Sequence, residues 1–167
     1  FATAFEAECL AAGGAVRAGD MFEVLRGGGS ARPEMITAIT RIHDAGLKTV
    51  SEQADQLANL TELDLAGTAV TDSGAACLSK FTALKRLDLS AARVSARSLE
   101  FAAALPALET LRFSGIAMED RSLTALQPAP TLTELALNGT SIGENAFEPL
   151  AALEHLRVLD VSGNNQV

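Results

Sequence analysis

A short pattern of apolar side chains, L-x-x-L-x-L, occurs five times at a constant spacing in this chain of 167 residues. The copies start at Leu60, Leu84, Leu108, Leu132 and Leu156, so each step is 24 residues. Leu, Phe or Val fills every apolar position of the frame in all five copies. Five copies in register indicate a repeat architecture, in which neighbouring units bury one continuous aliphatic core.

The two halves of each unit have different apolar periods. The first half alternates, as at Leu63 and Leu65, which predicts a short strand. The second half spaces its apolar residues by three, as at Ala75 and Leu78, which predicts a helical segment. Asp72 and its counterparts stand near the start of these segments, where we expect acceptors for free N–H groups. The strands should stack in parallel on the inside of an arc, with the helical segments outside.

The frame, followed by Thr68 and the run VTDSG in the first unit, resembles the leucine-rich-repeat family. The resemblance covers residues 60–167. It implies an α/β fold, a right-handed solenoid of 24-residue repeats with parallel strands on the concave face, helices on the convex face and a truncated last repeat. It also implies a protein partner on the concave face. The family carries Asn or a similar side chain at the ninth position of each repeat, where Ala92 and Ile116 stand here. We therefore expect a looser turn, or water, in the middle two repeats.

Residues 1–59 do not fit the frame, and we expect a helical N-terminal cap or a fused fragment there. The open end of a solenoid exposes apolar side chains and a strand edge, so an element with a polar outer side has to cover it. Pro33 predicts the start of a helix and Gly46 predicts its end. The run LKTV at 47–50 then predicts a short strand.

Residues 32–50 also resemble a segment of haloacid-dehalogenase-like phosphatases, in which a helix and a strand lead to a Thr or Ser. That family requires an Asp-x-Asp nucleophile motif, and this sequence contains none. The resemblance therefore implies no phosphatase activity. The alternative that it leaves open is a remnant or fusion of such a phosphatase with the repeat domain.

The side chains between the frame positions point out of the predicted sheet and form the candidate binding surface. The polar ones are Glu62, Asp64, Arg86, Asp88, Thr110, Arg112, Glu134, Asn138 and Asp160, and Val158 lies among them. Adjacent strands are about 4.8 Å apart, so Glu62 should neighbour Arg86, and Asp88 should neighbour Arg112. The chain has no Trp or Tyr, so Arg is the remaining residue type that is common at binding hot spots. The other interpretation is a solvated face on a purely architectural solenoid.

Charge and composition argue against several classes of function. A net charge of −8 argues against sequence-independent nucleic-acid binding and against docking on an anionic membrane. His43 and His155 have no second ligand at metal-binding spacing, and no nucleophile motif is present. We therefore expect a non-catalytic protein-interaction module without metal or cofactor.

The two ends of the sequence raise expectations of their own. The chain begins at Phe1 rather than Met, which indicates trimming or processing. The last repeat has no helical half, so we expect either a fragment of a longer solenoid or end-to-end self-association through that edge. The compartment stays open, although the two cysteines, Cys9 and Cys77, favour a reduced pair in the cytoplasm.

Overall fold

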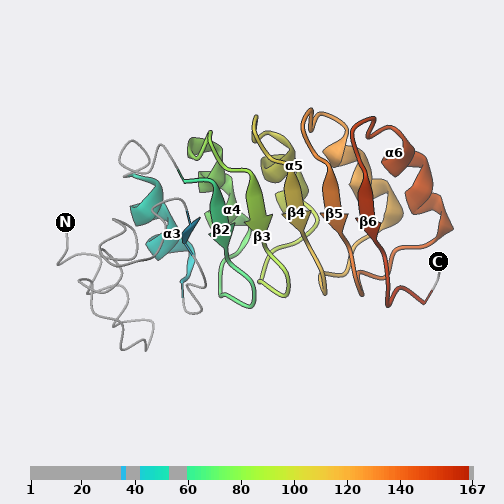
Figure 1. Ribbon diagram of the computed structural model, residues 1–167. Coiled ribbons are helices and arrows are strands. Elements are labelled where there is room, and N and C mark those ends of the chain that lie inside the picture. The colour runs from blue at the N-terminus through green and yellow to red at the C-terminus, as the bar shows by residue number, and fades with distance from the viewer. Residues whose placement is uncertain (1–34, 37–41, 53–59, 166–167) are drawn as a thin grey trace.

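The computed structural model describes residues 35–36, 42–52 and 60–165, and these form one parallel sheet backed by helices (Figure 1). The strands follow chain order across the sheet, and each one is hydrogen-bonded to the next along the chain. Their bounds are β1 Met35–Ile36, β2 Glu62–Asp64, β3 Arg86–Asp88, β4 Thr110–Arg112, β5 Glu134–Ala136 and β6 Val158–Asp160. The sheet is therefore a stack of consecutive repeats, as the 24-residue spacing predicts.

The strands pair in the register that the spacing predicts. Leu63 pairs with Leu87, Leu87 with Leu111, Leu111 with Leu135, and Leu135 with Leu159. All but Leu159 are buried. These leucines therefore form one line along neighbouring parallel strands, which confirms the α/β solenoid of stacked repeats.

Helical segments of several types lie behind the sheet (Figure 1). They are α3 Asp44–Ser51, α4 Asp72–Ala75, η2 Ala76–Lys80, α5 Ser98–Ala103, η3 Asp120–Leu126, η4 Glu144–Ala146 and α6 Phe147–Ala151. Their buried sides and the inward side chains of the strands enclose one aliphatic core, in which Phe113 is the largest fully buried side chain. The units thus share one continuous apolar core.

The described residues between 35 and 52 form a further strand-and-helix unit of the same stack. Strand β1 pairs in parallel with β2, and α3 follows it. The predicted helix from Pro33 to Gly46 is therefore wrong, because β1 lies within that span and Gly46 lies inside α3. The predicted strand at 47–50 is also wrong, because these residues belong to α3.

The core shows why this segment joins the stack. Ile42, Leu47 and Val50 are buried in the same cluster as the apolar side chains of the later repeats. The backbone N–H of Ala69 donates to the carbonyl of Ile42 at 3.2 Å, which ties the two units together. The remaining residues of 1–59 lie outside the described residues, so the division into 1–59 and 60–167 stays a prediction.

The chain turns sharply after each of the strands β2 to β6, at one position that recurs every 24 residues. The backbone φ there is positive at Gly67, Ala91, Gly115, Gly139 and Gly163, with values between 54° and 72°. The first four of these residues each donate a backbone hydrogen bond to the turn of the next repeat, at 2.8 to 3.0 Å. Glycine suits this conformation because it has no Cβ, and Ala91 is the exception.

The ninth position of the repeats is filled in two ways. Thr68 and Thr140 each donate a side-chain hydrogen bond to the carbonyl three residues earlier, at 2.7 and 2.9 Å, and the Asn164 amide donates to the carbonyls of repeats four and five. Ile116 is instead buried in the core, and Ala92 packs against the core. Apolar contacts thus replace the side-chain hydrogen bonds in the middle repeats, and a looser turn there stays a prediction.

Candidate binding surface on the strand face

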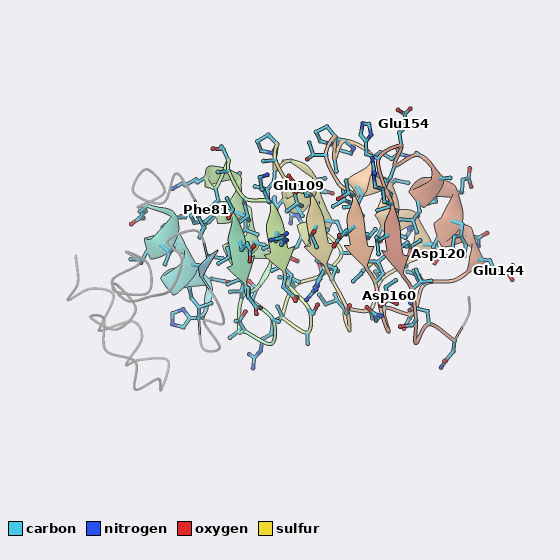
Figure 2. All side chains as sticks on the ribbon, in the orientation of Figure 1. Phe81, Glu109, Asp120, Glu144, Glu154 and Asp160 are labelled. Atoms are coloured by element: carbon cyan, nitrogen blue, oxygen red, sulfur yellow. The ribbon has the colours of Figure 1, made fainter. Side chains whose placement is uncertain are left out.

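The outward side chains of β2 to β6 and of the turns that follow them form a polar surface that we call the strand face. The strands lie in front and the helices behind in Figure 1, and Figure 2 shows the side chains of this face in the same view. Each strand contributes two outward positions on either side of an inward leucine, since side chains alternate along a strand. The structure brings the predicted residues together as follows: Glu62 and Asp64 on β2, Arg86 and Asp88 on β3, Thr110 and Arg112 on β4, Glu134 on β5, Asp160 on β6, and Asn138 just after β5.

Ion pairs between neighbouring strands occupy the half of the strand face formed by β2 to β4. Arg86 forms an ion pair and a hydrogen bond with Glu62, and Arg112 Nη1 lies 3.9 Å from Asp88 Oδ2. Both predicted neighbour relations are therefore present. The arginine side chains remain 61% and 64% exposed, so a partner can still reach both guanidinium groups.

The aspartates of the strand face have a local role that the sequence reading missed. Asp64 and Asp88 are direct partners across β2 and β3, which places two like charges side by side. Their Oδ1 atoms accept hydrogen bonds from the backbone N–H groups of Ala66 and Ser90, at 2.9 and 2.8 Å. Each carboxylate thus helps to fix the turn after its strand, which is a familiar role of aspartate before a turn.

The half of the strand face formed by β5 and β6 has a different character. Glu134 accepts a hydrogen bond of 3.3 Å from the Thr110 hydroxyl and stands directly opposite Val158. Val158 is 53% exposed, and it and Phe147 are the two exposed large apolar side chains of the described residues. Asp160 stands opposite Ala136. This half therefore combines accessible apolar surface with two carboxylates that form no ion pair with any of the described residues.

Hydrogen bonds stabilise the ionised form of the Asp160 carboxyl. The Asn138 side chain and the backbone and hydroxyl of Ser162 hold the pKa of Asp160 below its usual value, against a small opposing effect of desolvation. The Ser162 N–H lies 3.0 Å from Asp160 Oδ1. A negative charge is thus fixed at the end of β6 over the whole neutral pH range.

A row of small polar side chains runs across the repeats at the end of the strands. The Ser90 hydroxyl accepts from the Ser114 N–H at 3.2 Å, the Ser114 hydroxyl donates to Asn138 at 2.8 Å, and the Asn138 amide donates to Ser162 at 2.6 Å. The sequence reading selected Asn138 and missed the serines. Their 24-residue spacing was the signal that could have identified them.

Within ranges 35–36, 42–52 and 60–165, no three His, Cys, Asp or Glu side chains gather as metal ligands would. In the same part of the chain, every buried side-chain nitrogen or oxygen has a hydrogen-bond partner. None of the helices described there has the length and apolar character needed to cross a membrane.

Comparisons with known proteins identify two segments of the chain as similar to a repeat family. The Leucine Rich repeat family model matches residues 56–79 and 152–167, and these two segments include the first and last copies of the frame. No curated protein matches the chain.

Solved structures with a similar chain path include two internalins from Listeria monocytogenes. One internalin (inlF) is 17% identical over 79% of this chain and 40% of its own, with a TM-score of 0.47. Internalin C2 is 26% identical over 70% of this chain and 57% of its own, also with a TM-score of 0.47. This chain thus spans less than two thirds of either internalin.

Proposed function

We propose that this leucine-rich-repeat solenoid is a non-catalytic protein-interaction module that receives its partner on the strand face. Leucine-rich repeats support a protein-interaction role in general. The observation that favours the strand face is its organisation. The five strands hold ten outward positions in strict register, and helices bury the opposite side of the sheet. A surface of this kind presents a fixed arrangement of charges to a partner, which suits selective recognition.

Arg86 and Arg112 are the proposed principal contacts of the β2 to β4 half. Both stand near the centre of the strand face and are more than half exposed. Arg is one of the residue types that dominate binding energy at interfaces, and its planar group can contact a partner carboxylate without fully leaving Glu62 or Asp88.

A purely architectural role is the second candidate, and the ion pairs themselves favour it. Lys85 binds Glu109 at 2.8 Å, and Arg86 binds Glu62, so in both cases a side chain joins neighbouring repeats. Exposed pairs of this kind contribute about 0–1 kcal/mol each to stability. If that is their whole role, reversing their charges will change stability slightly and will change no binding constant.

Selection of binders from a random peptide display library on the immobilised chain separates the two candidates. Selected peptides are then titrated against the Arg86→Glu plus Arg112→Glu variant by isothermal calorimetry. We expect affinity to change at least about tenfold, downward for acidic peptides and upward for basic ones, because two exposed charges are reversed at the contact. Unfolding in urea checks first that the variant is folded.

A matched variant controls for net charge. Lys80→Glu plus Arg121→Glu reverses two exposed cations of η2 and η3 on the helical side. We expect this variant to bind with unchanged affinity to within about twofold, because screening at physiological salt limits long-range effects. The proposal fails if the helical-side variant loses binding while the strand-face variant keeps it.

A further inference from the structure

The two halves of the strand face differ in how their carboxylates are compensated. On β2 to β4, two arginines stand beside three carboxylates: Glu62 is paired with Arg86, Asp88 lies near Arg112, and Asp64 has no ion pair with any of the described residues. On β5 and β6, Glu134 and Asp160 form no ion pair with any of the described residues. Arg157, the cation next to β6 in the sequence, pairs with neither within that part of the chain. The β5 and β6 half therefore carries two negative charges that an outside cation can still neutralise.

Four side chains define this half, and we call them the β5–β6 square. Glu134 stands opposite Val158, and Ala136 stands opposite Asp160. The two carboxylates thus occupy one diagonal of the square and the two apolar side chains occupy the other. Diagonal neighbours on adjacent strands are about 7–8 Å apart. The 53% exposed Val158 gives the square an accessible apolar surface between its charges.

We infer that the β5–β6 square binds an extended segment of a partner protein that carries two basic side chains at positions i and i+2. The inference rests on the proposed function, because it names the class of partner that the strand face receives. Residues i and i+2 of an extended segment point to the same side and lie roughly 6.6 Å apart, which is close to the diagonal between the carboxylates. Their cationic groups reach Glu134 and Asp160, and their aliphatic stems cover Val158 and Ala136.

Charge complementarity selects this occupant over an acidic or a purely apolar one. An acidic segment would be repelled by both carboxylates, and an apolar segment would bury them without a counter-charge, which is costly. Long basic side chains satisfy both features of the square at once, because each has an apolar stem and a charged end. Asn138 and Ser162 hold the Asp160 carboxylate in place before the partner arrives.

The test uses a defined probe, the peptide acetyl-Ser-Thr-Arg-Ser-Arg-Thr-Ser-amide, titrated into the isotope-labelled chain and followed by NMR. We expect saturable shifts at the amides of 134–136 and 158–160, and weaker binding as salt is raised. A peptide with Glu in place of both Arg should give no such shifts. In a third peptide, diaminopropionate replaces both Arg, so each positive charge is carried by a side chain with a single methylene. This peptide should bind about threefold more weakly, because it lacks the aliphatic stems of Arg.

Variants of the square test the same contacts from the side of the chain. Glu134→Gln plus Asp160→Asn keeps the size of each side chain and one oxygen in each, and it removes both charges, so we expect affinity for the Arg peptide to fall roughly five- to tenfold. Val158→Thr keeps the branched shape and makes the surface polar, with an expected loss of about threefold. The charge-matched control is Glu148→Gln plus Glu154→Gln, which removes two exposed carboxylates elsewhere. Glu154 projects from the edge of the molecule opposite to Asp160 (Figure 2). This control should leave affinity unchanged.

Three results would overturn the inference. They are the absence of saturable shifts at β5 and β6, equal binding of the Arg and Glu peptides, and full affinity in the variant that lacks both carboxylates. Failure of this inference can be distinguished from failure of the proposed function. If library-selected partners are acidic and depend on Arg86 and Arg112, the inference fails and the proposed function stands. If selected partners shift only amides of the helices, both fail.

Discussion

The Asp44 carboxylate in α3 holds both donors of Thr71 at the start of α4. Oδ1 accepts the Thr71 backbone N–H at 2.7 Å, and Oδ2 accepts its hydroxyl at 2.5 Å. Asp72 does the same one repeat later, accepting the Ser95 N–H and hydroxyl at 2.8 and 2.6 Å. A carboxylate of one repeat thus binds the segment that leads into the helix of the next repeat, at the N-cap Thr71 and at Ser95, just before the N-cap of α5, so polar contacts as well as the core fix the stacking.

Gly74→Ala should destabilise the chain by about 1–3 kcal/mol, the usual cost of overpacking. A Cβ at Gly74 would lie 2.4 Å from Asp44 Oδ1 and 3.1 Å from Val70, so the carboxylate would have to leave Thr71. Urea unfolding followed by circular dichroism measures the change. Ser73→Ala, at the exposed neighbouring position, should change stability by less than about 0.5 kcal/mol. Wild-type stability of Gly74→Ala would show that Asp44 does not hold α4 in this way.

Asp72 should make stability depend on pH at the acid end. Burial raises the pKa of Asp72, but hydrogen bonds from Ser95 and Ser98 and the charge of Arg97 outweigh it, so the pKa lies below the ordinary value of 3.8. The unfolded chain then binds more protons than the folded chain at acid pH. The stability that Asp72 contributes is therefore fully present above its ordinary pKa, and it is lost as the pH falls through the lower pKa of the folded state. Urea midpoints measured from neutral pH to the acid limit should therefore fall less steeply for Asp72→Asn than for wild type.

The control for this pH dependence is Glu148→Gln, at an exposed carboxylate of α6. It removes the same charge without touching the contact between repeats, so its pH profile should follow wild type. Identical profiles for Asp72→Asn and wild type would contradict the role assigned to Asp72.

Ala91→Gly should stabilise the chain. Ala91 has a φ of 54° at a turn position where the other described repeats have glycine. Removing its Cβ relieves the strain of the left-handed backbone conformation, which is about 1–2 kcal/mol. Glycine also has more freedom in the unfolded chain, which offsets part of this gain, so we expect a net stabilisation of about 0.5–1 kcal/mol. Gly115→Ala is the reverse change. A Cβ there meets nothing closer than 4.0 Å, so its expected loss of about 1 kcal/mol comes from φ alone. Thermal unfolding measures both, and a loss of stability in Ala91→Gly would contradict the assignment.

Asn164 and Thr140 share one buried hydrogen-bond cluster, and their substitutions should differ in cost. Asn164 donates to the carbonyls of Leu137 and Val161 and accepts the Thr140 N–H, at 2.7 to 2.8 Å. Asn164→Ala leaves the buried Thr140 N–H without its acceptor, so we expect the free energy of unfolding to fall by about 2–3 kcal/mol. Thr140→Val should cost about 1 kcal/mol, because Asn164 still satisfies Leu137. Equal costs in urea unfolding would show that the Asn164 amide is not the main partner.

The register of the later repeats could be predicted because each buried leucine of a strand has a counterpart 24 residues away. Leu63 and Leu87 pair as that spacing requires. The unit of β1 and α3 could not be found in this way, because Met35 pairs with Glu62 at a spacing of 27 and no leucine frame surrounds it. The match between IHDAGL at 42–47 and VTDSGA at 70–75 was the usable signal.

Contacts between repeats were harder to predict than the positions of the strands. The pair of Glu62 and Arg86 followed from register alone. Asp72 was expected to cap its own helix, but Thr71 occupies that N-cap position, and Asp72 binds the next repeat instead. A sequence pattern gives the distance along the chain and not the direction in which a short side chain points, so such partners could not be assigned in advance.

The most direct test of the strand face as the binding surface is NMR mapping of a library-selected peptide on the isotope-labelled full chain. We expect the largest shifts and the strongest cross-saturation on β2 to β6 and on the turns that follow them. Amides of α4, α5, η3 and α6 should change little. Shifts concentrated on those helices, with the strands unaffected, would show that the strand face is not the binding surface.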